Sequence, residues 1–426
     1  MRRRTLILAA ISVVAALGAA GCSTSTPSTP VQGPGPGTAT AASPSPSAAD
    51  GATQAKPATT ASPAATQASP SCGGPAYTIL GAPVLTSMQF VSAAQGWAVG
   101  ENAILATTDG GAHWTTQLSG RLNLLYADFV NGQDGWAVGT TSLLTTTDGG
   151  AVWTPLTEPC PLIRSVHFIS PTDGYAVAGG INLAGTNPEV PLAGGEILAT
   201  SDGGHSWHPL PAPKDVQTVC FSDPQHGWIG ANGQLYRTID GGDRWTLLTS
   251  SSGALGGGQG AIMTVECAGD GTAWALRIGP GAAMSQEPHV GYYADQSGAT
   301  ALFAELYFQT PGATPTAAAP GSYAGPFSAL SPSAAVFIDN CVACGEGTAP
   351  WDLVTNSGST LAKEGNVGGI NSAEAASFVS SQVGWVAGAE MTFGNSTTRT
   401  QQRIVATTDG GRSWHIQYTG PWTTSN

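Results

Sequence analysis

Apolar and polar positions alternate in short blocks along most of this 426-residue chain. An apolar pair, Ile104-Leu105, precedes a polar turn that ends in tryptophan, Thr107-Thr108-Asp109-Gly110-Gly111-Ala112-His113-Trp114. Blocks this short, broken by glycine, favour strands joined by tight turns over helices. The Asp carboxylate is suited to accept turn N–H groups, and Gly-Gly allows positive φ. The Trp is suited to pack on an apolar face.

This motif, here called the Asp-Gly-Gly turn, occurs five times. Its aspartates are Asp109, Asp148, Asp202, Asp240 and Asp409, and its tryptophans are Trp114, Trp153, Trp207, Trp245 and Trp414. Identical copies at regular intervals indicate a repeat architecture. Such repetition predicts that the aspartates cap turns and do not act as catalytic acids.

A second signature lies upstream of each turn: a Phe is followed six residues later by Gly and an aromatic residue. It starts at Phe90, Phe129, Phe168, Phe221 and Phe378, with weaker versions at Cys267 and Ser331. Each of the seven units reads as four short strands, which cannot bury both faces alone. We therefore predict an all-β fold, a seven-bladed β-propeller within residues 72–426. The blades are expected at about 85–119, 120–160, 161–211, 212–252, 260–309, 327–364 and 368–420.

The N-terminus resembles a bacterial lipoprotein signal. Met1-Arg2-Arg3-Arg4 and the apolar Thr5–Ala20 have signal-peptide proportions, and Ala19-Ala20-Gly21 precedes Cys22. Ala19 departs from the Leu that this class prefers. Residues 1–21 are predicted to be removed and Cys22 lipidated, with ordinary secretory cleavage as the alternative. The Sec and twin-arginine routes both stay open.

Residues 22–71 are predicted to form a disordered tether. The 49 residues Ser23–Ser71 are almost entirely Ser, Thr, Pro, Ala, Gly and Gln, with too few apolar side chains to offset the entropy of ordering. As a flexible coil they reach roughly 35–42 Å. The sequence thus predicts a propeller that is lipid-anchored to the cell membrane on its extracytoplasmic face.

The predicted propeller is acidic, with 10 Lys and Arg against 26 Asp and Glu, a net charge of −16. Such a surface disfavours nucleic acid and bare anionic lipid. We expect membrane association through the lipid anchor alone and a monomer. The histidines show no metal-ligand spacing, and neither a metal nor another cofactor is expected.

Six cysteines follow Cys22 and permit three disulfides in an oxidising compartment. Cys267 takes the Phe position of the fifth unit, whereas Cys220 stands one residue before it in the fourth. Because adjacent strand positions face opposite ways, this offset suits a bridge between the two blades. Cys341 and Cys344 favour a loop disulfide over a redox pair or half a zinc site. Cys72 and Cys160 remain as the third pair.

Departures from the repeat lie on one predicted rim. Loops between second and third strands carry insertions at 181–195, 279–289, 340–350 and 391–402, on the rim opposite the Asp-Gly-Gly turns. Recognition concentrates on such loops. The candidate binding residues are Asn187, Glu189, His289, Trp351, Arg399 and Arg403. Trp351 has a second interpretation, a core residue of a degenerate blade.

The turn resembles the Asp box, or bacterial neuraminidase repeat. The longer unit, Phe-x5-Gly-Trp-Ala-Val-Gly to Asp-Gly-Gly-x-x-Trp, is similar to the photosystem II assembly and stability factor family and its bacterial homologues outside photosynthesis. The resemblance covers about residues 85–420 and implies the propeller fold. It also implies binding of membrane-protein subunits, although a lipoprotein signal with a long tether is not the plant pattern.

Two functions follow from the resemblance. The first is a non-catalytic binding or assembly scaffold whose partner is a protein or glycan at the cell surface. The second is a sialidase-like glycoside hydrolase, which requires three arginines, a Tyr nucleophile with a Glu partner, and an Asp acid. The propeller has eight arginines, among them Arg121, Arg164 and Arg277, but no Phe-Arg-Ile-Pro motif. No catalytic residue is assigned.

Overall fold

The computed structural model describes most of the predicted propeller. The described residues are 85–120, 122–139, 142–157, 163–179, 194–232, 234–248, 261–268, 273–278, 289–294, 305–307, 323–331, 334–340, 349–355, 360–393 and 397–425. Several predicted positions lie outside them: Cys22, Cys72, Cys160, Cys341, Cys344, Asn187 and Glu189.

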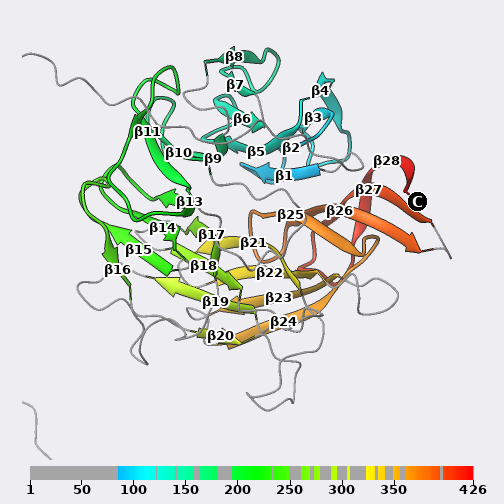
Figure 1. Ribbon diagram of the computed structural model, residues 1–426. Coiled ribbons are helices and arrows are strands. Elements are labelled where there is room, and N and C mark those ends of the chain that lie inside the picture. The colour runs from blue at the N-terminus through cyan, green and yellow to red at the C-terminus, as the bar shows by residue number, and fades with distance from the viewer. Residues whose placement is uncertain are drawn as a thin grey trace, which may run out of the picture. The chain divides into compact units, whose positions relative to one another are not determined.

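The described residues form 28 strands in seven antiparallel sheets of four, and each sheet is contiguous in sequence. Figure 1 shows the sheets arranged as blades of a ring, so the fold is the predicted seven-bladed β-propeller. The first three blades comprise β1 (Leu85–Phe90), β2 (Gly96–Gly100), β3 (Ala103–Thr107), β4 (Thr115–Ser119); β5 (Leu124–Phe129), β6 (Gly135–Gly139), β7 (Leu143–Thr146), β8 (Thr154–Leu156); β9 (Ile163–Phe168), β10 (Gly174–Ala178), β11 (Glu196–Thr200) and β12 (His208–Pro209).

The other four blades have the same order of strands. They comprise β13 (Val216–Phe221), β14 (Gly227–Ala231), β15 (Gln234–Thr238), β16 (Thr246–Leu247); β17 (Ala261–Cys267), β18 (Ala273–Ile278), β19 (His289–Ala294), β20 (Glu305–Tyr307); β21 (Tyr323–Ser331), β22 (Ala334–Asn340), β23 (Ala349–Thr355), β24 (Thr360–Val367); β25 (Ser372–Phe378), β26 (Gly384–Phe393), β27 (Thr398–Thr407) and β28 (His415–Ser425).

Two details of the last blades differ from the sequence-based boundaries. Blade 6 begins at Tyr323, inside the stretch expected to link it to blade 5. The expected insertion at 391–402 in blade 7 is not a separate loop, because β26 and β27 continue in register as far as the pair Phe393 and Thr398. The extra residues therefore lengthen the blade itself.

The six-residue spacing between Phe and Gly follows from the first hairpin of each blade. Phe90 stands directly opposite Gly96 in the β1–β2 ladder, and its ring covers the glycine. A Cβ at Gly96 would lie 2.5 Å from that ring, so no larger residue fits without movement. In blade 5 the smaller Cys267 takes the Phe position, and Ala273 takes the glycine position opposite it.

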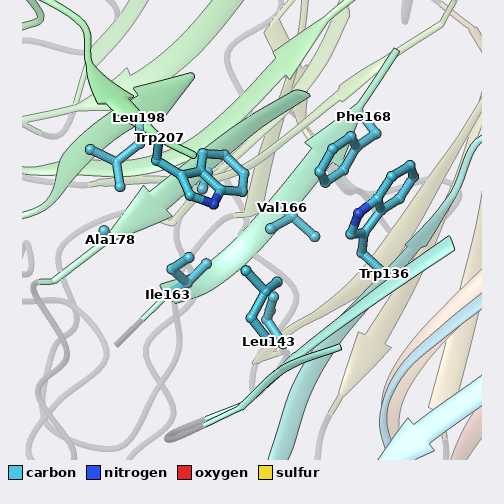
Figure 2. Close-up of a cluster of buried hydrophobic side chains, with 10 residues drawn as sticks. Trp136, Leu143, Ile163, Val166, Phe168, Ala178, Leu198 and Trp207 are labelled. Atoms are coloured by element: carbon cyan, nitrogen blue, oxygen red, sulfur yellow. The ribbon is translucent and has the colours of Figure 1, made fainter. Parts of the chain in front are cut away.

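Seven buried hydrophobic clusters fill the interfaces between neighbouring blades, including the one that joins blade 7 to blade 1. Figure 2 shows the cluster between blades 2 and 3, where Trp136 of β6 stacks on Phe168 of β9 at 3.5 Å between ring centroids. Trp207, which follows the Asp-Gly-Gly turn of blade 3, meets the same Phe edge-on at 6.1 Å. Phe168 therefore contacts two repeat tryptophans, one from the preceding blade and one that follows the turn of its own blade.

Candidate functional site

The Asp-Gly-Gly turn is held together by its own polar side chains. In blade 2, Asp148 Oδ1 accepts the N–H of Val152 at 2.9 Å and the Thr146 hydroxyl at 2.8 Å. Thr146 Oγ1 also accepts the N–H of Gly150 at 2.8 Å. Gly149 and Gly150 have φ values of 71° and 89°, the left-handed region that glycine tolerates. The other four copies repeat these contacts.

These bonds also set the acidity of the turn aspartates. The pKa of Asp109 is lowered to about 2, chiefly by the N–H of His113 and then by its ring. The pKa of Asp148 is lowered chiefly by the N–H of Val152, that of Asp240 chiefly by the Thr238 hydroxyl, and that of Asp409 chiefly by the Ser413 hydroxyl. Each carboxylate is therefore ionised and committed to its own turn. This geometry suits a turn cap and leaves no carboxyl proton to donate at neutral pH.

The turn also contacts the preceding blade. Trp97 Nε1 of blade 1 donates to the carbonyl of Gly149 in blade 2 at 3.1 Å, and Gln117 Nε2 donates to the same oxygen at 2.7 Å. Equivalent bonds join Trp136 to Gly203 and Trp385 to Gly110. The conformation of the turn therefore exposes a carbonyl oxygen that accepts hydrogen bonds from the preceding blade.

Blade 5 lacks an Asp-Gly-Gly turn, and the consequence falls on Trp228 of blade 4. This indole is fully buried, and its Nε1 has no hydrogen-bond partner among the described residues. Trp97, Trp136 and Trp385 each donate to a carbonyl in the Asp-Gly-Gly turn of the next blade, and blade 5 has no such turn to accept from Trp228. A buried donor without an acceptor costs free energy, so the interface between blades 4 and 5 needs another connection.

That connection is a disulfide. Cys220 of β13 bonds to Cys267 of β17, with Cα atoms 5.7 Å apart. The disulfide predicted from the one-residue offset between Cys220 and Cys267 is therefore confirmed. Both residues also line the central channel of the propeller, a cavity of about 390 Å³.

The channel is lined by the first strand of every blade, and one repeat position links the blades around it. The residue before the Phe position reaches from each blade to the backbone at the Phe position of the next. Gln89 accepts from Phe129 N at 2.6 Å, Asp128 from Phe168 N at 2.6 Å, Glu266 from Ala329 N at 2.7 Å, Ser328 from Phe378 N at 3.1 Å and Ser377 from Phe90 N at 2.9 Å, while His167 Nε2 donates to Phe221 O at 2.9 Å.

With the Cys220–Cys267 bridge, these contacts make a closed ring of seven ties within the described residues. We call it the channel ring: Gln89, Asp128, His167, Cys220, Glu266, Ser328 and Ser377. Sequence reasoning singled out Cys220 and missed the other six. The available signal was that a polar residue or Cys stands before the Phe position in every unit. In blade 6 this requires a correction, because Ala329, which pairs with Ala335, takes the Phe position and not Ser331.

Two carboxylates of the channel ring are perturbed by burial. Desolvation raises the pKa of Glu266 to about 7, against a smaller lowering by the N–H of Ala329. Desolvation also raises the pKa of Asp128, although His167 and the N–H of Phe168 oppose it. Tyr126, 38 % exposed and lining the channel, has a raised pKa because of desolvation and the nearby carboxylates. Glu374 adds a further acid, so the described lining is acidic.

The candidate rim residues have different environments. The Arg399 guanidinium is exposed and lies 4.8 Å above the Trp422 ring. Arg403 forms an ion pair with Glu390 and donates to the carbonyl of Gly369 at 2.8 Å, so it holds blade 7 together. His289 begins β19, and Trp351 lies in β23 opposite Ile338. The side chains of His289 and Trp351 lie outside the description.

One arginine of the hypothetical sialidase triad is described in full. Arg164 Nη2 donates to the carbonyl of Val216 at 2.7 Å, and burial lowers the pKa of Arg164 to about 10. This bond joins blades 3 and 4. Within the described residues, no group of three or more His, Cys, Asp or Glu side chains is placed to hold a metal ion. The same residues contain no helix long and apolar enough to span a membrane.

Comparison with known proteins agrees with this repeat. Residues 79–209 match the family model of the Photosynthesis system II assembly factor YCF48. The matched region ends with β12 and so covers the first three blades. The resemblance to photosystem II assembly factors, predicted from the repeat, is confirmed there. No curated protein matches the chain.

Solved structures share the fold at low identity. A GH74 enzyme from Niastella koreensis is 9 % identical with a TM-score of 0.51, over 80 % of this chain and 67 % of that one. Hydrazine synthase from Kuenenia stuttgartiensis is 8 % identical with a TM-score of 0.51, over 72 % and 92 %. The likeness to these two structures establishes the fold alone. An ancestral GH74 enzyme is 13 % identical with a TM-score of 0.48, over 78 % of this chain and 54 % of that one.

Proposed function

We propose that this protein is a non-catalytic binding or assembly scaffold, held by a lipid on Cys22 at the extracytoplasmic face of the membrane. The repeat of the photosystem II assembly factor family supports an assembly role. The leader and the Ser/Thr/Pro-rich stretch support a tethered domain outside the cytoplasm. The partner is a protein or glycan at the cell surface.

The channel ring carries the argument against catalysis. Asp128 and Glu266 line the channel where the first strands meet, and each accepts a backbone N–H of the next blade. The turn aspartates are bonded in the same way to their own turns. These carboxylates hold the fold together, which leaves recognition to the rims.

The rim opposite the Asp-Gly-Gly turns is the proposed binding face, because that rim carries the insertions and individual side chains. The test is a pull-down from solubilised native membranes with the lipidated protein. Deletion of residues 182–192 and the substitution Trp351→Ala should weaken capture of the partner at unchanged melting temperature. Retention of binding by both variants, with loss on changing the turns, would contradict this choice of face.

A glycoside hydrolase is the second candidate, favoured by one observation. Glycosidases pair a protonated carboxyl with an ionised one, and the raised pKa of Glu266, about 7, suits an acid at neutral pH. Glu266→Gln discriminates between the two functions. An amide oxygen can still accept the N–H of Ala329, so a scaffold keeps its fold and its partner. A hydrolase would lose reducing-sugar release from its polysaccharide substrate.

A further inference from the structure

Blade 7 carries a tip that projects past the propeller. Its strands β26 and β27 have 10 residues each, whereas their counterparts β2 and β3 have five. The five extra residues of β26, Ala389–Phe393, extend the blade by roughly 16 Å. Figure 1 shows these long strands at the right of the ring, with β28 beside them. We call residues 389–393, 397–401 and 420–425 the blade 7 tip.

The tip exposes aromatic side chains. Phe393 is 60 % exposed and Trp422 is 38 % exposed. Arg399 lies over the Trp422 ring and has no carboxylate partner among the described residues. This is an unusual combination on a domain whose net charge is −16.

The aromatic residues lie on opposite faces of the tip. Trp422 is paired with Gln401, which is paired with Glu390, and residues in direct register share a face. Phe393 stands three positions from Glu390 and therefore faces the other way. A protein partner that docks on a flat sheet uses one face. Apolar side chains on both faces suit a tip that enters a medium surrounding it on all sides.

The chain leading to Cys22 joins the propeller at the base of this tip. The first described residue is Leu85, whose N–H donates to Gln402 Oε1 at 3.2 Å. Gln402 is paired with Ala389, where the extension begins. The first described residue therefore lies on the rim from which the tip extends. The predicted tether reach of roughly 35–42 Å exceeds the length of the tip, so an anchored propeller can bring the tip to the bilayer.

We propose that the blade 7 tip contacts the lipid surface, with Phe393 and Trp422 entering the headgroup region and Arg399 meeting lipid phosphate. Aromatic side chains favour this interface, and a neighbouring guanidinium complements its anionic groups. The acidic body does not prevent the contact. Phe393 lies four residues past Ala389, roughly 13 Å from the base of the tip, which exceeds the Debye length of about 8 Å at physiological salt and so screens the repulsion. Trp422, paired through Gln401 with Glu390, lies nearer the base.

The contact rests on the proposed anchoring for its biological setting but is tested without it. The mature chain from position 22, carrying Cys22→Ser, is floated with vesicles of phosphatidylcholine containing about one-fifth phosphatidylglycerol. We expect a vesicle-bound fraction that Phe393→Ser with Trp422→Ser lowers by about 10-fold or more. Arg399→Ala should lower it less and reduce its dependence on phosphatidylglycerol.

A matched control comes from the opposite rim. Val152 and Ile239 are 61 % and 59 % exposed on Asp-Gly-Gly turns, and Val152→Ser with Ile239→Ser should leave flotation unchanged. Equal flotation of the tip variant and its parent would overturn the proposal, provided that both melt at the same temperature. A second result would also overturn it: the parent protein does not bind the vesicles, but it cross-links to a membrane protein only when the tip is intact. That result would identify a protein partner for the tip. Neither result affects the lipid on Cys22, which is read from acyl labelling of the native protein.

Discussion

Gln89 grips the backbone of Phe129 in the neighbouring blade from both sides. Its Oε1 accepts the Phe129 N–H at 2.6 Å, and its Nε2 donates to the Phe129 carbonyl at 3.1 Å. The Gln89 side chain thus makes the two backbone hydrogen bonds that a neighbouring strand would make, although blades 1 and 2 share no strand. The stability of the molecule depends on such contacts between blades.

Asp148→Ala should destabilise the protein and lower the urea midpoint of unfolding, because the N–H of Val152 loses its acceptor. The turn carbonyl that receives Trp97 should shift as well. The measurement is equilibrium unfolding in urea, with Asp148→Asn as the milder control. Loss of partner binding at an unchanged melting temperature would show instead that the turn is a recognition element.

Trp97→Phe should cost about 0.5–1.5 kcal/mol more than Trp228→Phe. Both indoles are buried, but Trp97 Nε1 donates to Gly149 whereas Trp228 Nε1 has no partner. The pair of substitutions removes the same atoms from similar packing. Unfolding free energies of the two variants measure the value of the bond. Equal costs would mean that the bond from Trp97 contributes nothing.

Glu266 should make the protein more stable at pH 5 than at pH 8. Its carboxyl pKa is raised from 4.5 to about 7 in the folded chain, so the folded state binds this proton more tightly than the unfolded state. The resulting stabilisation is complete below pH 4.5 and is lost as the pH rises through about 7. Glu266→Gln should flatten this part of the profile of melting temperature against pH. An unchanged slope would assign the effect to other groups.

Replacing Cys220 and Cys267 together with Ser should lower stability by about 2–4 kcal/mol, since the bridge closes a loop with a sequence separation of 47. The other described hydrogen bond between these first strands runs from Val265 N to Thr218 Oγ1 at 3.0 Å. Reduced and oxidised wild-type protein should differ in urea midpoint by a similar amount. In the double Ser variant, reductant should change the urea midpoint only through the remaining cysteines, so the change should be smaller than in the wild-type protein.

Cys22→Ser should abolish incorporation of labelled palmitate and move the protein out of the salt-washed membrane fraction. The reason is that a diacylglyceryl group attached through a thioether needs the Cys22 thiol. Ser23→Ala is the control and should leave labelling intact. Palmitate incorporation by the Cys22→Ser protein would exclude this residue as the lipid site.

The fold was readable from the sequence because its repeat encodes contacts between near neighbours. The spacing from Phe90 to Gly96 reflects a hairpin pair, and Asp109 bonds within its own turn. The channel ring was harder to predict, since Gln89, His167 and Ser377 share a position but no chemical type. Only the covalent pair, Cys220 and Cys267, was recognisable as a connection. The blade 7 tip was placed correctly as an insertion, but its strand pairing was missed because Thr398–Gln402 looks like a polar loop.

The absence of strand exchange among the described sheets has a consequence for how the molecule assembles. None of these sheets takes a strand from the far end of the chain, so the blades can form in sequence order. The seam between blades 7 and 1 must be the last to close. It is secured by Phe90 stacked on Trp385 at 3.5 Å and by Ser377 accepting the Phe90 N–H. Among the described residues, each hydrogen bond across this seam has a side chain as one partner, and forced unfolding of the ring should begin there.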